Sequence, residues 1–172
     1  MTTANKITFF RIFCIPLFLL LAYTGRMAWA FAFYVIACLS DFADGYIARH
    51  YNQITDFGKF MDPLADKMLV LSAMCFFVER LCMPGWVVAI VLFREFAVSG
   101  LRLIAVEQGP VIAAAWSGKI KTAVTMVGLA VMLLFSDIWA VGLVVCILIV
   151  VTTVYSGIEY FYKNRDVFRH VE

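Results

Sequence analysis

Four aspartates that fall in two pairs are the residues of this chain best suited to chemistry. Asp41 and Asp44 are three residues apart, and Asp62 and Asp66 are four apart, so each pair shares one face of a helix. Four neighbouring carboxylates repel one another unless cations compensate their charge. All-oxygen ligands suit Mg²⁺ or Mn²⁺, and two such ions can assist displacement at phosphorus. The spacing therefore predicts that these four aspartates bind two divalent ions.

Small residues and one arginine lie between and beside the aspartates. Gly45, Ala48 and Gly58 have little or no side chain, which lets a ligand approach the backbone closely. Arg49 can bind a phosphate through two parallel hydrogen bonds. The segment therefore indicates a phosphate-containing ligand next to the metal ions.

A second group of charged residues is basic and lies further along the chain. Arg94 and Arg102 are eight residues apart, near one face of a helix, and Lys119 and Lys121 begin the next apolar segment. An arginine in the middle of a membrane span needs a partner or a water-filled cavity, but the adjacent Glu95 should point about 100° away. We expect the four cations to bind an anionic group such as phosphate. Alternatively, Lys119 and Lys121 follow only the general excess of positive residues on the cytoplasmic side of membrane proteins.

The elements that position these residues are predicted to be membrane helices. Of the 172 residues, 64% are hydrophobic and 15% are charged, whereas soluble domains are about 45–50% apolar. The composition thus excludes an ordinary soluble domain, and a net charge of +2 gives no argument for a nucleic-acid partner. Only residues 138–158 form a charge-free segment of spanning length. Charged residues interrupt the other apolar segments, and in a membrane protein such residues indicate function.

The apolar segments and turn residues predict an all-α membrane protein with six transmembrane helices in a single domain, residues 1–172. The expected helices cover residues 7–23, 28–51, 57–81, 86–106, 118–135 and 139–162. Pro63 would lie in the first turn of the third helix or would kink that helix. Most lysines and arginines fall on the side of the two termini, which predicts that both termini are cytoplasmic.

The pattern that joins the aspartates to the small residues resembles a known signature. Residues 41–66 read Asp-x2-Asp-Gly-x2-Ala-Arg-x8-Gly-x3-Asp-x3-Asp, which is similar in every position to the signature of the CDP-alcohol phosphotransferase family. The resemblance implies a homodimer of six-helix chains, each with a two-metal site in a cavity on the cytoplasmic side. It also implies transfer of a substituted phosphate from a CDP-linked donor to an alcohol, with release of CMP. Asp66 would then be both a metal ligand and the base that accepts the proton of the alcohol.

The same resemblance implies where the donor binds. Gly45, Ala48, Arg49 and Gly58 would hold the cytidine diphosphate. Asn5 and Thr8, three residues apart near the N-terminus, could line the nucleotide side of the cavity.

Secondary motifs are similar to those of bacterial phosphatidylglycerophosphate synthases. They are Asn5-x2-Thr8-x2-Arg11 and the segments 62–67, 94–102 and 118–122. This narrower resemblance implies CDP-diacylglycerol as the donor and sn-glycerol 3-phosphate as the acceptor, in a multi-pass protein of the bacterial cytoplasmic membrane. The free phosphate of that acceptor would bind the basic cluster: Arg94, Arg102, Lys119 and Lys121.

Two alternatives stay open. Within the family, the acceptor could instead be phosphatidylglycerol, as in a cardiolipin synthase, or inositol phosphate, which would use a similar basic pocket. Outside the family, aspartates at membrane depth could belong to a divalent-cation or proton transporter. A transporter gives no reason for the small residues and Arg49 around the aspartates, and no acidic relay crosses the bilayer. The enzyme is therefore the favoured interpretation.

Overall fold

A computed structural model describes the backbone of residues 3–50, 56–107, 115–136 and 138–165. Side chains are described for the same residues except 3–8, 41–50, 56–60, 62 and 106–107. This part of the chain forms six α-helices and no strand. The helices are α1 (Thr3–Tyr23), α2 (Met27–His50), α3 (Asp56–Glu79), α4 (Gly85–Glu107), α5 (Trp116–Leu134) and α6 (Trp139–Lys163).

The six predicted helices are all found, and their ends differ little from the prediction. The largest difference is at the start of α1, which begins at Thr3 rather than at residue 7. The turn predicted at Gly25 contains that glycine with a φ of 77°, a conformation that glycine adopts without steric cost. Pro63 lies in the interior of α3, so the alternative that it occupies the first turn is wrong.

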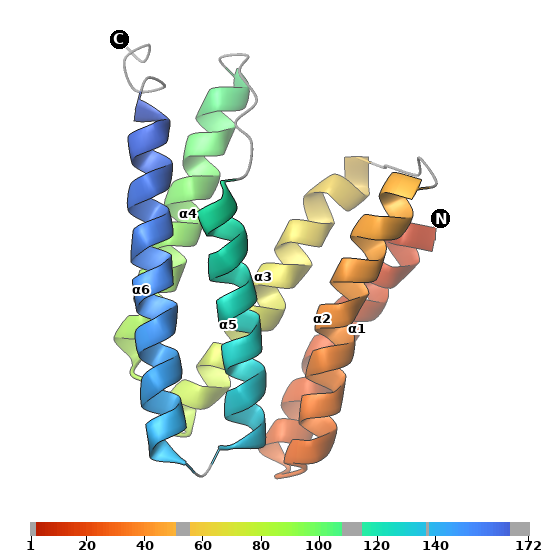
Figure 1. Ribbon diagram of the computed structural model, residues 1–172. Helices are drawn as coiled ribbons and strands as arrows, with labels where there is room; N and C mark the ends of the chain where they lie inside the picture. The colour runs from red at the N-terminus through yellow and green to blue at the C-terminus, as the bar shows by residue number, and fades with distance from the viewer. Residues whose placement is uncertain (1–2, 51–55, 108–114, 137, 166–172) are drawn as a thin grey trace.

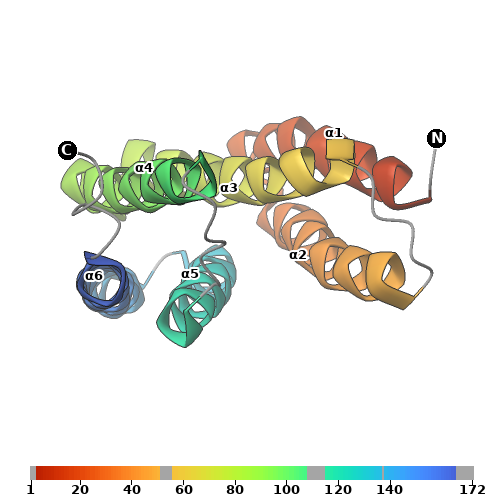
Figure 2. The same cartoon turned by 90° about the horizontal axis from the view of Figure 1, so that it is seen from above.

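The helices pack in two layers. Figure 2 shows α1, α3 and α4 in one layer and α2, α5 and α6 in the other. Successive helices run in opposite directions, so the start of α1 and the end of α6 lie at the same end of the bundle (Figure 1). The ends of α2 and α4 lie at that end too. The end of α2 and the start of α3, which carry the aspartates of the motif, therefore lie at the same end of the bundle as the start of α5 (Figure 1).

Aromatic and aliphatic side chains fill the space between the layers. Phe18 of α1 and Tyr34 of α2 are fully buried, with ring centroids 5.6 Å apart, and Phe76 and Phe77 of α3 extend the cluster. The hydroxyl of Tyr34 donates a hydrogen bond to the carbonyl oxygen of Met126, 3.3 Å away. The bond gives the buried hydroxyl a partner within the apolar core, and it also joins α2 to α5.

The outer surface of the bundle is apolar as well. Phe13, Trp29, Phe93, Trp116 and Trp139 are each more than half exposed, and they come from five different helices. Soluble monomers rarely expose contiguous apolar patches of more than a few hundred Å². Within the described residues, α5 and α6 are long and apolar enough to cross a membrane, and two shorter apolar segments lie in α1 and α2. The fold is thus all-helical, with a surface suited to lipid.

Candidate functional site

A polar cavity of about 590 Å³ lies where α3, α4, α5 and α6 approach one another. This volume is in the usual range of small-molecule sites. Its charged and phenolic lining residues are Asp66 and Lys67 from α3, Arg94, Glu95 and Arg102 from α4, Lys119 and Lys121 from α5, and Tyr160 from α6. The cavity thus brings one aspartate of the motif together with all four cations of the predicted basic cluster.

Helical spacing explains which residues each helix contributes. The lining positions of α4 include 91, 94, 95 and 102, and those of α5 include 118, 121, 122 and 125. Residues three or four positions apart share one face of a helix. Each helix therefore presents one face to the cavity, and the polar residues of that face belong to an otherwise mostly apolar helix.

Glu95 lies at the centre of the charged groups. Its Oε1 atom is 2.8 Å from Nζ of Lys121 and 3.0 Å from Nη1 of Arg94, and its Oε2 atom is 3.5 Å from Nζ of Lys67. The sequence predicts that Glu95 points about 100° away from Arg94, yet the two side chains form an ion pair. Although the two Cβ atoms diverge on the helix, the long arginine side chain rotates until its guanidinium reaches the carboxylate.

The side chain of Arg94 occupies space left by two glycines. A Cβ atom on Gly118 of α5 would lie 3.3 Å from Nη2 of Arg94, and one on Gly157 of α6 would lie 3.4 Å from its Cγ. Arg94 is therefore packed against both α5 and α6, with 12% of its side chain exposed.

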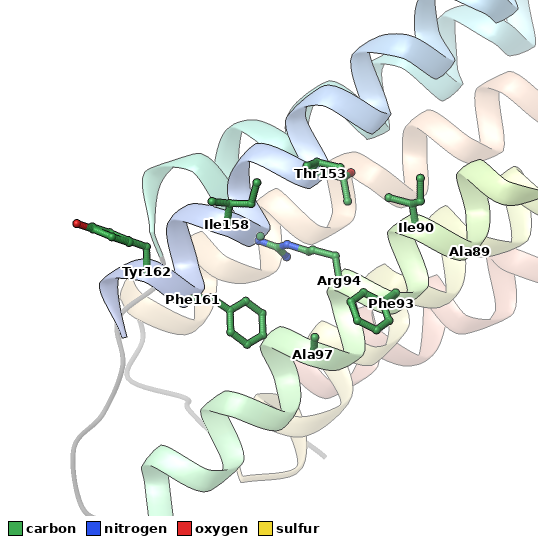
Figure 3. Close-up of a pocket in the computed structure, with 11 residues that line it drawn as sticks. Ala89, Ile90, Phe93, Arg94, Ala97, Thr153, Ile158, Phe161 and Tyr162 are labelled. Carbon is green, nitrogen blue, oxygen red and sulfur yellow. The ribbon is translucent and has the colours of Figure 1, made fainter. Parts of the chain in front are cut away.

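Arg94 also lines a second, apolar groove of about 830 Å³ between α4 and α6. Figure 3 shows its side chain extending from α4 toward α6, near Ile158 and Thr153. Phe93 and Ile158 line the groove and are mostly exposed, so the groove opens on the outer surface. Arg94 thus lies between an apolar groove on the outer surface and the polar cavity.

The other two cations of the cluster are held by aromatic side chains. Nε of Arg102 donates a hydrogen bond of 3.0 Å to the hydroxyl of the buried Tyr160. Nζ of Lys119 lies 5.0 Å from the ring centroid of Trp116, within cation–π range. Neither cation forms an ion pair with a carboxylate among the described side chains. Both charges are therefore available to an anionic ligand.

The predicted metal ligands are only partly described. The side chain of Asp66 lines the cavity, whereas the side chains of Asp41, Asp44 and Asp62 lie outside the described residues. Their backbones belong to α2 and α3, which pack against each other. An all-carboxylate donor set on two adjacent helices fits Mg²⁺ or Mn²⁺. Among the described side chains, no group of three or more His, Cys, Asp or Glu residues forms a metal site.

The predicted donor-binding residues fall where the structure describes only the backbone. Asn5 and Thr8 belong to α1, Gly45, Ala48 and Arg49 to α2, and Gly58 to α3. Their side-chain geometry lies outside the described part of the chain. Arg11, three residues after Thr8, is fully buried.

Sequence reasoning missed three of the charged and phenolic residues that line the cavity: Lys67, Glu95 and Tyr160. Lys67 was noted only as part of a motif and as a cation on the side of the termini. Glu95 was identified only as a neighbour of Arg94, although a lone acid within a basic, apolar segment is a signal that could have pointed to it. Tyr160 gave no signal, because its contact with Arg102 joins residues 58 positions apart.

Comparison with known protein families and curated sequences gives consistent matches. The sequence model of the family described as CDP-alcohol phosphatidyltransferase matches residues 1–155. A Bacillus subtilis protein named CDP-diacylglycerol–glycerol-3-phosphate 3-phosphatidyltransferase is 39% identical over 191 residues, covering 94% of each chain. A Mycobacterium tuberculosis protein named probable phosphatidylglycerophosphate synthase is 38% identical, covering 95% of this chain and 82% of the relative. A Shigella flexneri protein with the same name as the Bacillus relative is 37% identical, covering 92% of each chain.

Proposed function

The chain belongs to the CDP-alcohol phosphatidyltransferase family, and we propose that it transfers the phosphatidyl group of CDP-diacylglycerol to sn-glycerol 3-phosphate. The products would be phosphatidylglycerophosphate and CMP. The printed names of the relatives support this donor and acceptor. The observation that carries the proposal is the cavity in which Asp66 lies among Arg94, Arg102, Lys119 and Lys121.

The cations of the cavity suit the phosphate of the acceptor. That group carries a charge of about −1.5 to −2 at neutral pH, and the described lining supplies more positive than negative side chains. The proposed contacts of this phosphate are Arg94, Arg102, Lys119 and Lys121. Of these, Arg102 and Lys119 have no carboxylate partner among the described side chains. Arginine and lysine complement each other here, since the guanidinium can form paired hydrogen bonds with a phosphate and the ammonium acts as a point charge.

Asp66 is the proposed base. With the acceptor phosphate on the cations, its hydroxyl would lie toward Asp66, which accepts the hydroxyl proton as the new bond forms. The hydroxyl oxygen attacks the phosphorus of the phosphatidyl group, and the bond from that phosphorus to the oxygen of CMP breaks. No covalent enzyme intermediate is needed, because positioning and charge stabilisation can supply the catalysis.

The family generally uses divalent metal ions, and the proposed ligands are Asp41, Asp44, Asp62 and Asp66. Bound Mg²⁺ or Mn²⁺ would neutralise charge on the pyrophosphate of the donor. The proposed donor site consists of Asn5, Thr8, Gly45, Ala48, Arg49 and Gly58. Their positions in α1, α2 and α3 are compatible with a nucleotide site next to the aspartates.

We further propose that the chain is a single domain whose six helices all cross the bacterial cytoplasmic membrane, with both termini and the cavity on the cytoplasmic side. Lysine and arginine are more frequent at the end of the bundle that carries the two termini, which supports this orientation. The exposed apolar side chains of five helices support immersion in lipid. A homodimer is expected from the family resemblance.

The direct test is CMP release by the purified protein in lipid nanodiscs. The assay supplies CDP-diacylglycerol and Mg²⁺ or Mn²⁺ with one acceptor at a time: sn-glycerol 3-phosphate, inositol phosphate, phosphatidylglycerol or serine. We expect release with sn-glycerol 3-phosphate and its loss when EDTA removes the metal. Preference for another acceptor would correct the substrate. No release with any acceptor, together with ion uptake into proteoliposomes, would support the transporter instead.

A further inference from the structure

We propose that Glu95 is a positioning residue of the acceptor site, whose carboxylate holds Lys121, Arg94 and Lys67 where they can bind the acceptor phosphate. This inference rests on the proposed function, because it assigns a role within the same cavity. Glu95 itself would not bind the acceptor, since a carboxylate repels a phosphate. It would act through the cations that surround it.

The contacts of Glu95 connect three helices at one carboxylate. Lys67 comes from α3, Glu95 and Arg94 from α4, and Lys121 from α5. Lys67 also donates a hydrogen bond of 2.8 Å to Oγ of Ser99, one turn further along α4. Among the described side chains, no other carboxylate lies within 4.0 Å of these three cations. Glu95 is therefore the common anchor of the cations.

Burial makes this anchor important. Only 5% of the Lys121 side chain is exposed, 12% of Arg94 and 16% of Glu95. Lys121 and Arg94 both contact the same oxygen atom, Oε1, so two like charges lie side by side. Without the carboxylate, their repulsion in a poorly solvated site would separate them or drive them toward water.

The cavity remains positive while Glu95 is charged. Among the described lining side chains there are five cations and two carboxylates, so the positive groups around Glu95 outnumber the negative ones and Glu95 does not cancel their attraction for a phosphate. Its effect is on the position of the charges rather than on their sum. Lys67 is adjacent in sequence to the proposed base Asp66, so its ion pair with Glu95 connects the group of cations to the helix that carries the base.

Two substitutions separate a positioning role from simple charge compensation. Glu95→Gln keeps the shape and loses the charge, and we expect the KM for sn-glycerol 3-phosphate to rise about tenfold while the donor KM stays within about twofold of wild type. Glu95→Asp keeps the charge but withdraws the carboxylate by one methylene. We expect the melting temperature of Glu95→Asp to equal that of the wild type and its acceptor KM to be about threefold higher.

A double variant tests whether Glu95 acts through Lys121. If it does, Glu95→Gln combined with Lys121→Met will have an acceptor KM no higher than that of Lys121→Met alone, because residues acting as a unit are not additive. The matched control is Glu159→Gln, since Glu159 pairs with Lys163 on α6 outside the cavity. Its acceptor KM should equal that of the wild type.

The outcomes distinguish this inference from the proposed function. Wild-type turnover with a normal acceptor KM in Glu95→Asp would overturn the positioning role and leave the function intact, whether or not Glu95→Gln raises the acceptor KM. Multiplicative effects of Glu95→Gln and Lys121→Met would also overturn it. If Glu95→Gln fails to fold, Glu95→Asp still decides, because wild-type kinetics in that variant contradict positioning. Absence of wild-type CMP release would instead overturn the proposed function.

Discussion

At the scale of single residues, the proposed base and two of the proposed phosphate-binding groups come from different helices. Asp66 lies on α3, whereas Arg102 and Lys119 approach from α4 and α5, each held by an aromatic ring rather than by a carboxylate. For the proposed roles, the base and the phosphate-binding groups must act on different ends of the acceptor, because a direct ion pair between them would occupy both. The acceptor would then reach from the cations, which bind its phosphate, to Asp66, which accepts the proton of its hydroxyl.

The role of Asp66 as a base predicts the effect of removing its charge. Asp66→Asn cannot accept a proton, so we expect CMP release to fall at least about 100-fold. The measurement is the initial rate with saturating donor, acceptor and metal. Glu79→Gln is the matched control, because this acid lies at the other end of α3, where it accepts a hydrogen bond from Tyr23. A variant Asp66→Asn with near wild-type rate would exclude Asp66 as the base.

The hydrogen bond between Arg102 and Tyr160 predicts a milder effect. Tyr160→Phe keeps the ring beneath the guanidinium but removes the hydroxyl that accepts from Nε. Hydrogen bonds to charged groups contribute about 1.5–3 kcal/mol, and partial exposure of Arg102 reduces this contribution, so we expect the acceptor KM to rise about threefold to tenfold. Steady-state kinetics with varied acceptor check this. Tyr155→Phe, on an exposed part of the same helix, should leave the acceptor KM unchanged.

At the scale of helices, glycines determine how closely the cavity-forming segments approach. Gly118 of α5 faces the guanidinium of Arg94 at the cavity end of the bundle. Gly142 of α6 faces the carbonyl oxygen of Cys82, in the turn between α3 and α4 at the opposite end. The two positions therefore allow tests of site geometry and of helix packing separately.

Substituting these two glycines should give opposite results. A Cβ atom at position 142 would lie 3.0 Å from a backbone oxygen that cannot rotate away, so Gly142→Ala should destabilise the fold by about 1–3 kcal/mol without changing the acceptor KM. Gly118→Ala would place its Cβ 3.3 Å from a movable guanidinium, so it should raise the acceptor KM with little loss of stability. Thermal unfolding in one detergent and steady-state kinetics are the measurements. A raised acceptor KM in Gly142→Ala alone would contradict this assignment.

At the scale of the whole molecule, the two-layer bundle separates an apolar exterior from a polar interior at one end. Exposed aromatic residues such as Phe13, Phe93 and Trp139 face outward, while charged side chains from α3, α4 and α5 line the cavity. Ionisable residues in a membrane protein usually face such a cavity, where water or a partner lowers their cost. The arrangement suits an enzyme that takes one lipid-linked substrate from the membrane and one soluble substrate from water.

The proposed orientation predicts which residues are accessible from each side. Leu81, 91% exposed in the turn between α3 and α4, should lie outside the cell, and Lys163, the last residue of α6, should lie inside. In a background with Cys82→Ser, a membrane-impermeant maleimide should label Leu81→Cys in intact cells and Lys163→Cys only after the membrane is opened. The unsubstituted background is the control. Labelling of Lys163→Cys in intact cells would reverse the orientation.

Sequence by itself determined the six helices, the family signature at residues 41–66 and the membership of the basic cluster. Apolar segments, turns and residue spacing are local properties, so they can be read without knowing how the helices pack. Only the tertiary structure decided that Glu95 contacts Lys121, Arg94 and Lys67, and that Tyr160 supports Arg102. These contacts join different helices or depend on the rotation of a long side chain. They follow from the packing of α3, α4, α5 and α6 and not from the spacing of residues along the chain.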